Sequence, residues 1–328
     1  MKSSNIGGQA VIEGIMMRHG DVYSVGVRKP DGEIEVKVED YKSVFGKHKW
    51  MKWPLLRGVV SFVDSLVVGI RCLMYSATFF EEEEETKELT LEEEAAKKAK
   101  EERENKWMMY GTVVLSVLLT VGLFMILPYY LAGLLRNLTD SETLIALSEA
   151  IVRILIFLTY LLLISRMKDI QRTFMYHGAE HKCINCVENG MELTVENVMK
   201  SSRQHKRCGT SFLMFVVVIS VIFYLFISLI PFQAHWIKVA LRLALVPVIA
   251  GVAYEIIRLA GSSDNRWVSL LSKPGLALQR LTTKEPDESM AEVAIAAVEA
   301  VFDWRAYLAG EEETSVPHHA DCPEGCRQ

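Results

Sequence analysis

The chain has 328 residues and a formal net charge of −5; 50% of its residues are hydrophobic and 23% are charged. Its mean hydropathy is +0.19, whereas most soluble globular chains fall below zero. An acidic chain lacks the basic excess that offsets nucleic-acid phosphates, so we expect no nucleic acid among its partners. Six cysteines in a chain of this length do not form a disulfide scaffold. The composition predicts a membrane protein whose first partner is the lipid bilayer.

Residues 1–50 are expected to form a small β-containing region in the cytosol. Segments 22–28 and 33–39 alternate between apolar and polar residues on either side of Asp31-Gly32, a pattern typical of a hairpin. Met1-Lys2 is not followed by an apolar run, so we expect this stretch to belong to the mature protein rather than to a cleaved signal.

Residues 51–80 are predicted to form an amphipathic or membrane-associated helix that does not cross the bilayer. Arg57, Asp64 and Arg71 are seven residues apart, which places them on one stripe of a helix with apolar residues covering the rest. The following residues, 81–106, are rich in glutamate and lysine and are predicted to form a charged linker.

Residues 107–260 are predicted to contain four transmembrane helices joined by loops. Each candidate span has close to the ~20 apolar residues that a bilayer requires. The loop at 165–211 holds most of the basic residues that flank these spans, which predicts that this loop and both termini lie in the cytosol. The expected location is the plasma membrane, which the chain crosses several times. The four candidates are Met108–Leu127, Leu144–Ile164, Phe212–Ile230 and Val239–Leu259. The predicted fold is therefore mainly α, a polytopic helical membrane protein with about four spans and a small N-terminal β region.

The C-terminal part should return to the cytosol. Residues 261–310 include an amphipathic helix that begins near Pro286, because a proline and early acids precede apolar residues at helical spacing. Residues 311–328 are polar and are expected to form a flexible tail.

The cytosolic loop contains a pattern that is typical of a metal site. His177 and His181 are four residues apart, so on a helix their imidazoles lie on one face and can reach the same ion. Glu180 stands between them in the order H-x-x-E-H, in which inverted zinc hydrolases use two histidine ligands and a glutamate as general base. His205 and Cys208 follow in the same loop, and both are residue types that bind zinc.

Four further residues are weaker candidates for the site. Cys183 and Cys186 have the C-x-x-C spacing of metal or redox sites, and in the reducing cytosol metal binding is favoured over a disulfide. Glu255 is an acid near the end of the fourth span, which either is functional or pairs with Arg258 at the interface. The other candidate is Glu13, the single acid in an apolar N-terminal stretch.

Several segments resemble those of a known family. They are Gly7–Arg18, Tyr176–Lys182, Arg207–Phe212, Tyr254-Glu255 with Arg258, and Pro274–Pro286. These segments are similar to the YqhQ family of bacterial membrane proteins, domain of unknown function 1385, whose members are described as predicted metal-dependent enzymes. The resemblance covers about residues 1–305, apart from the charged linker, and implies a multi-pass protein with a metal site. Lys206 stands where we would expect proline in the family motif, a departure that affects only the local turn.

Three functions follow from these observations. The first is a metal-dependent hydrolase with zinc as its divalent ion, acting on a membrane-protein segment or a lipid headgroup at the cytosolic face. The second is a non-catalytic scaffold or regulator in which His177, His181, His205 and Cys208 close a structural zinc site. The third is transport along a path lined by Glu255, Glu149 and Arg153, which the unbroken spans support little. The sequence predicts no oligomeric state.

Overall fold

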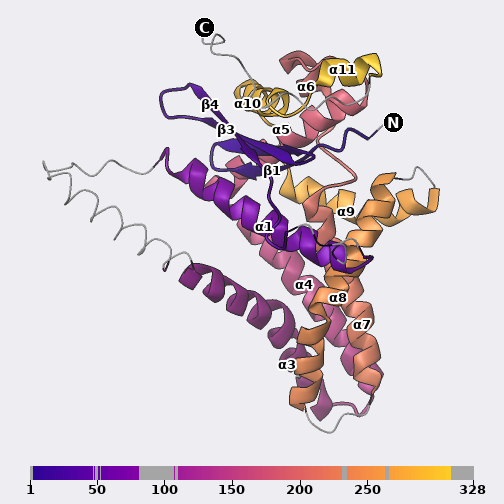
Figure 1. Cartoon of the computed structure of the whole chain (residues 1–328). Helices are drawn as coiled ribbons and strands as arrows, with labels where there is room; N and C mark the ends of the chain where they lie inside the picture. Colours follow the sequence, from indigo (N-terminus) through magenta and orange to yellow (C-terminus); the bar gives the residue numbers. More distant parts are fainter. Residues whose placement is uncertain are drawn as a thin grey trace, which may run out of the picture. The chain divides into compact units, whose positions relative to one another are not determined.

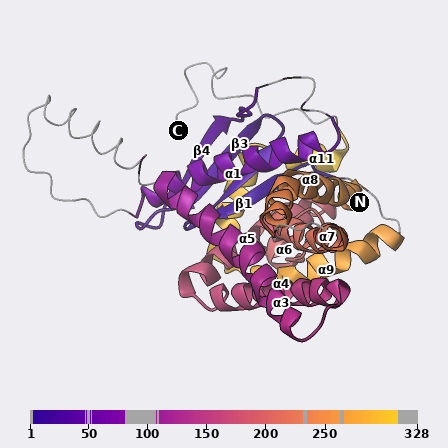
Figure 2. The same ribbon diagram turned by 90° about the horizontal axis from the view of Figure 1, so that it is seen from below.

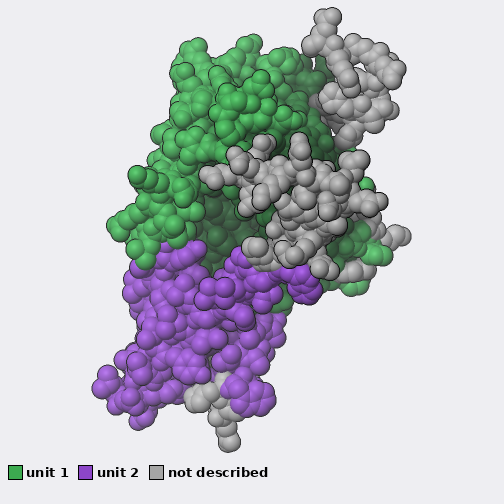
Figure 3. All heavy atoms as spheres, turned by 90° about the vertical axis from the view of Figure 1, so that its left-hand side faces the viewer, with its two compact units in different colours: residues 1–80, 161–220, 245–328 green, residues 81–160, 221–244 purple. Residues whose placement is uncertain are grey.

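The computed structural model describes the chain in several stretches (Figure 1), namely residues 3–46, 48, 51, 53–80, 107, 110–230, 235–262 and 266–311. The predicted charged linker at 81–106 and all but the first residue of the predicted tail at 311–328 lie outside the described residues. The chain divides into two compact units (Figure 3). Unit 1 comprises residues 1–80, 161–220 and 245–328, and unit 2 comprises residues 81–160 and 221–244.

Unit 1 contains an antiparallel sheet of four strands in the order of the sequence. The strands are β1 (Gly7–Val11), β2 (Gly14–His19), β3 (Val22–Arg28) and β4 (Ile34–Asp40). The predicted hairpin is confirmed as β3 and β4, which pair from Arg28–Ile34 to Val22–Asp40. Gly32 in its turn has φ +92°, a backbone conformation that favours glycine. The hairpin of β1 and β2 was not predicted.

Helices cover both faces of the sheet (Figures 1 and 2). Helix α1 (Leu56–Ala77) packs on one face, where Val68 and Cys72 contact the apolar side chains of β1 to β3. Helices α5 (Lys168–Glu188) and α10 (Glu288–Glu299) pack on the other face, around Ile15 and Met17. Because strand side chains alternate between faces, β2 divides its apolar residues between these two cores.

The amphipathic helix predicted near Pro286 is confirmed as α10, which begins after Asp287. The Asp287 side chain accepts a hydrogen bond from the Met290 amide at 2.9 Å, as an N-cap residue does. Helices α6 (Val195–Lys200), α9 (Arg266–Thr282) and α11 (Trp304–Ala309) complete the described helices that belong wholly to this unit.

Five described helices are long and apolar enough to cross a membrane, judged by length and composition. They are Leu56–Ala77, Tyr110–Asn137, Glu142–Ile164, Gly209–Ile227 and Trp236–Ala260. Four of them correspond to the four predicted spans, so those helices are confirmed. The fifth is α1, and the number of candidates is therefore five rather than four. We predicted that this segment does not cross the bilayer because it has a polar stripe. Asp64 of that stripe is buried and accepts hydrogen bonds from the Tyr41 hydroxyl and the Val44 amide, both at 2.9 Å.

Unit 2 has a buried charged cluster. Its described helical segments include a π-helical turn, η2 (Gly122–Ile126), then α3 (Leu127–Gly133), η3 (Leu134–Asn137) and most of α4 (Glu142–Ile164). Glu149 and Arg153, which are four residues apart on α4, form an ion pair at 2.7 Å, and Arg242 of α8 (His235–Ser262) also binds Glu149 at 2.6 and 2.9 Å. Arg153 Nε donates to the Phe124 carbonyl inside the π-helical turn at 3.0 Å.

Candidate metal site

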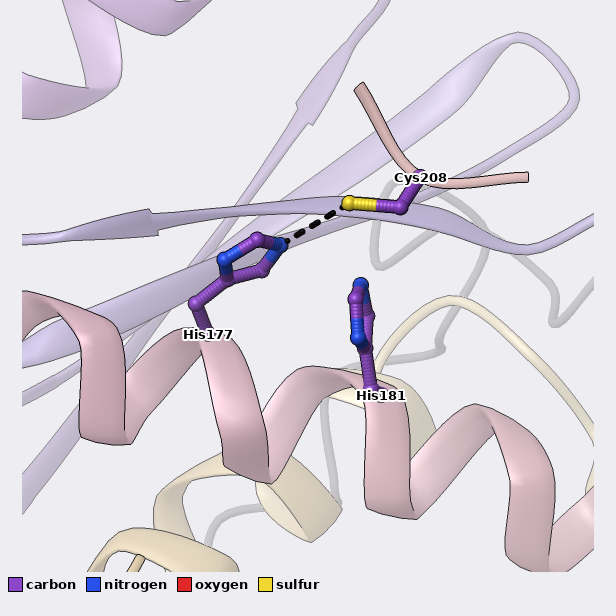
Figure 4. A group of neighbouring side chains, drawn as sticks. All are labelled: His177, His181 and Cys208. Atoms are coloured by element: carbon purple, nitrogen blue, oxygen red, sulfur yellow. Dashed lines mark hydrogen bonds between the residues drawn. The ribbon is translucent and has the colours of Figure 1, made fainter. Parts of the chain in front are cut away.

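His177 and His181 lie one turn apart on α5, and Cys208 lies just before α7 (Gly209–Leu229) (Figure 4). One ligand atom from each of the three residues lies within 4.8 Å of the other two. His177 Nε2 lies 3.1 Å from Cys208 Sγ. The structure therefore brings together three of the four predicted metal ligands.

Backbone carbonyls orient both imidazole rings. His177 Nδ1 is 2.9 Å from the Thr282 carbonyl oxygen, and His181 Nδ1 is 2.7 Å from the Arg203 carbonyl oxygen. A carbonyl only accepts hydrogen bonds, so each Nδ1 carries the proton and each Nε2 keeps its lone pair. Histidine ligands in metal sites are held in this way.

The donor set fits a zinc ion. His181 Nε2 is buried and has no hydrogen-bond partner among the described residues, so its lone pair is available to an ion. Burial lowers the pKa of His181, which favours the neutral imidazole that metals bind. Tetrahedral zinc, with Zn–N of about 2.1 Å and Zn–S of about 2.3 Å, holds its ligand atoms roughly 3.4–3.6 Å apart. Small side-chain movements would bring the three residues to that geometry.

Glu180 is buried on the same helix as the two histidines. Its Oε2 has no hydrogen-bond partner among the described residues. Burial raises the pKa of Glu180 to about 7, against the opposing effects of His177 and of the Gly8 amide. Gly8 of β1 packs directly against the carboxylate, because a Cβ at this position would lie 2.8 Å from Glu180 Cδ. The sequence therefore brings a carboxyl group that titrates near neutral pH beside the histidines.

His205 is close to the cluster but faces another group. Its ring centroid is 5.8 Å from that of His181, and its Nε2 lies 3.4 Å from Glu188 Oε2. Burial would raise the pKa of Glu188, but hydrogen bonds from His205 and the Ser4 amide and the charge of Arg207 hold it at about 2. His205 therefore belongs to a buried ion-pair network, and the structure does not bring it into the three-residue cluster.

The weaker candidates lie outside the cluster. Glu255 pairs with Arg57, with Arg57 Nε 2.6 Å from Glu255 Oε1, rather than with Arg258 as we had considered. Glu13 pairs with Arg172 and accepts a hydrogen bond from the Tyr176 hydroxyl at 3.2 Å.

The two cysteines of the C-x-x-C pair are core residues. Cys183 and Cys186 are fully buried among the apolar side chains between α5 and the sheet. Burial raises the pKa of both thiols, which opposes formation of the thiolate that binds a metal.

Residues that the sequence did not single out support the site. Gln279 is fully buried; its side chain accepts from the His205 amide at 2.9 Å and donates to the His205 carbonyl at 2.7 Å. Gln279 and Thr282 both lie in the 274–286 segment that carried the family resemblance, and that resemblance was the only signal that could have found them. Glu188 lies in none of the motifs that the sequence analysis identified, so no sequence signal pointed to it.

The cluster opens into a cavity of about 580 Å³ within unit 1. His177, Glu180 and Cys208 line this cavity. Other parts of its wall are apolar side chains from α1, α7 and α8, and main chain of β1; among them are Phe62, Leu66, Phe212, Leu213 and Ile257. The cavity is therefore polar at the cluster and apolar along its helical walls.

These features define a mainly helical protein with apolar helices of membrane-spanning length, a small antiparallel sheet and a His/Cys cluster that could hold a metal ion. The chain belongs to the family described as "Protein of unknown function (DUF1385)", which matches residues 53–304. It is 34% identical to the uncharacterized protein YqhQ of Bacillus subtilis (strain 168) over 323 residues, which cover 95% of this chain and 96% of that protein. No solved structure matches the chain.

Proposed function

We propose that this protein is a membrane-embedded hydrolase that uses one zinc ion held by His177, His181 and Cys208, with Glu180 as general base. One observation carries the proposal. Three ligand atoms converge beside a buried carboxylate whose Oε2 has no partner among the described residues, and His177, Cys208 and Glu180 line one cavity. Three protein ligands leave a fourth position open, as catalytic zinc sites do.

The residues have complementary tasks in this mechanism. The ion would supply a Lewis acid that polarises a substrate carbonyl and lowers the pKa of a neighbouring water. Glu180 accepts the proton that the water loses and later gives it to the leaving group, for which a pKa of about 7 is well suited. The Thr282 and Arg203 carbonyls keep the imidazoles in the correct tautomer.

We also propose that the site lies on the cytosolic side of the plasma membrane and that α1 lies along the membrane surface. The half of α1 that includes Val68 and Cys72 packs under the sheet, whose strand β4 exposes Glu35 and Lys37 to solvent. Exposed charges of this kind belong in water, so that half of α1 stays at the interface. Four helices then span the membrane, and both termini are cytosolic.

Metal analysis of the purified full-length chain tests the proposal. Protein prepared in detergent without chelator should contain about one zinc per chain, and His181→Ala and Cys208→Ala should each lose it. Glu180→Gln should keep the metal, and Cys186→Ala is a matched control in which a buried thiol outside the cluster is removed. Protein without metal would contradict the proposal.

His205→Ala separates the catalytic site from the structural alternative. If the site is catalytic with three ligands, this variant keeps its zinc, because His205 faces Glu188. Loss of zinc equal to that of His181→Ala would instead indicate a closed four-ligand site in a non-catalytic scaffold. In the same set, Glu180→Gln should fail to complement a deletion strain, because removal of a general base typically costs ~10²–10⁴ in rate.

A further inference from the structure

Strand β1 is an edge of the sheet that lies beside the metal cluster. The strand order is β1-β2-β3-β4, so β1 pairs with a neighbour on one side only. Gly7 and Gln9 are exposed, and residues 6–10 line the same cavity as His177 and Glu180. An accessible edge strand offers main-chain groups to another chain.

The pairing shows which groups β1 offers. The two-residue turn between β1 and β2 closes on the Val11–Gly14 pair. In an antiparallel pair, bonded residues alternate along the strand, so Val11, Gln9 and Gly7 bond to β2. Gly8 and Ala10 therefore turn their N–H and C=O groups outward, which agrees with the Gly8 amide facing Glu180.

A groove continues along this edge. A second cavity, of about 520 Å³, shares six lining residues with the cavity at the cluster, among them Gly7, Gly8 and Ser65. The two cavities therefore share a wall along β1, and Arg18 lines the second cavity but not the first. A strand of five residues extends over roughly 17 Å, which is the length of edge that β1 offers to an extended chain.

We propose that the substrate of this hydrolase is an extended polypeptide segment that pairs with β1 as a fifth strand and presents one peptide bond to the cluster. The proposal rests on the hydrolase function proposed above. A polypeptide main chain can pair with the outward C=O of Gly8 and the outward N–H and C=O of Ala10, since the Gly8 N–H already faces Glu180, whereas an acyl chain would leave these groups without hydrogen bonds.

The reaction at the presented bond is hydrolysis. The oxygen of water forms a bond to the carbonyl carbon, and Glu180 accepts the proton from that water. The C–N bond then breaks, and the proton passes from Glu180 to the leaving nitrogen. The products are a carboxylate and an amine, and no oxidant or reductant is consumed.

Peptide cleavage with modified backbones tests the pairing. The zinc-loaded full chain in detergent is incubated with a tryptic digest of a bacterial proteome, and new peptide ends are identified by mass spectrometry. The best-cleaved peptide is then synthesised with a single N-methyl group at each position in turn. Pairing with β1 predicts that cleavage is lost at alternate positions, because only alternate amides face the edge. Cleavage that does not depend on the position of the N-methyl group with a period of two overturns the pairing. Cleavage of the lipid in fluorescent phosphatidylglycerol vesicles, with no peptide cleaved, also overturns it.

A blocking variant tests the groove itself. Ser65 is exposed on α1 and lines both cavities without contacting the cluster, so Ser65→Trp should fill the groove and reduce cleavage at least tenfold with zinc content unchanged. Leu73→Trp, on the exposed face of the same helix outside the groove, is the matched control and should cleave normally. Equal activity of the two variants overturns the proposal.

Hydrogen exchange separates this inference from the hydrolase function. The digest is added to Glu180→Gln, which binds without cleaving, and exchange is measured over residues 6–12. At about 90% occupancy the Ala10 amide should exchange about tenfold more slowly, because the Gly8 amide already faces Glu180 and the Ile12 amide already donates to the Ser76 hydroxyl at 3.1 Å. Slow exchange with no cleavage by the zinc-loaded chain would support the pairing and overturn the hydrolase. Unchanged exchange in a chain that holds zinc overturns the pairing alone.

Discussion

Replacing Gly8 with alanine should disturb Glu180 while leaving the metal ligands in place. The added Cβ would lie 2.8 Å from Glu180 Cδ and 2.9 Å from the Met16 carbonyl oxygen. Carbon atoms in relaxed contact are about 3.5–4.0 Å apart, so one group must move by roughly 1 Å. Met16 O belongs to the paired strand and cannot yield easily, so the carboxylate must move.

The matched control is the neighbouring glycine. An alanine Cβ at Gly7 would meet nothing within 4 Å, and its main effect is to restrict the unfolded chain, which stabilises by about 0.4–1 kcal/mol. Overpacking at Gly8 should cost about 1–3 kcal/mol. Thermal unfolding of detergent-solubilised protein should therefore place Gly8→Ala roughly 2–10 °C below the wild type, with Gly7→Ala at or above it.

Activity and metal content complete this assay. Gly8→Ala should retain zinc, because the atoms nearest to the new methyl group belong to Glu180 and Met16 rather than to a metal ligand, and it should lose hydrolytic rate as Glu180 is displaced. If both glycine variants unfold at the same temperature and keep full activity, β1 and α5 do not pack as described, and the reasoning is refuted.

Three further substitutions have expected outcomes. In metal-free protein, the free energy of unfolding of the wild type should fall as the pH rises from about 4.5 through about 7, because folded Glu180 holds its proton more tightly than unfolded Glu180. Glu180→Gln should remove this pH dependence and be more stable than the wild type by about 3 kcal/mol at pH 8. Glu188 has the opposite sign, so its contribution is present above about pH 4.5 and lost as pH falls toward 2, and Glu188→Gln should unfold more easily than wild type at pH 7 but not at pH 2. Glu149→Ala leaves Arg153 and Arg242 without their shared carboxylate and should destabilise unit 2 by about 3–5 kcal/mol, measured by thermal unfolding, whereas an unchanged unfolding temperature would show that the buried cluster is not formed.

Patterns within short stretches of the sequence predicted the β3–β4 hairpin, helix α10 and the proximity of two histidines. The hairpin of β3 and β4 follows from period-two alternation around a turn, and α10 follows from helical spacing after a proline. His177 and His181 were brought together by their spacing alone, because a helix places residues four apart on one face.

Long-range contacts determined what the sequence could not predict. His205 has the same chemistry as the other histidines, and only the position of Glu188 turns its ring away from the cluster. The pairing of Glu255 with Arg57 and the addition of Arg242 to Glu149 join distant segments, which no periodicity encodes. Strand β1 was missed because Gly7-Gly8 and its short length give a weak strand signal.

The sheet packs against α10, so strands from the start of the sequence contact a helix from near its end, and this has a consequence for biosynthesis. The strands are made first, but the face around Ile15 and Met17 needs α10, which is made after every apolar helix has left the ribosome. The Thr282 carbonyl that orients His177 is also made late. In the proposed hydrolase, a stalled or truncated chain would therefore reach the membrane with an incomplete site. On that proposal the site would become complete only after Thr282 and α10 have been made.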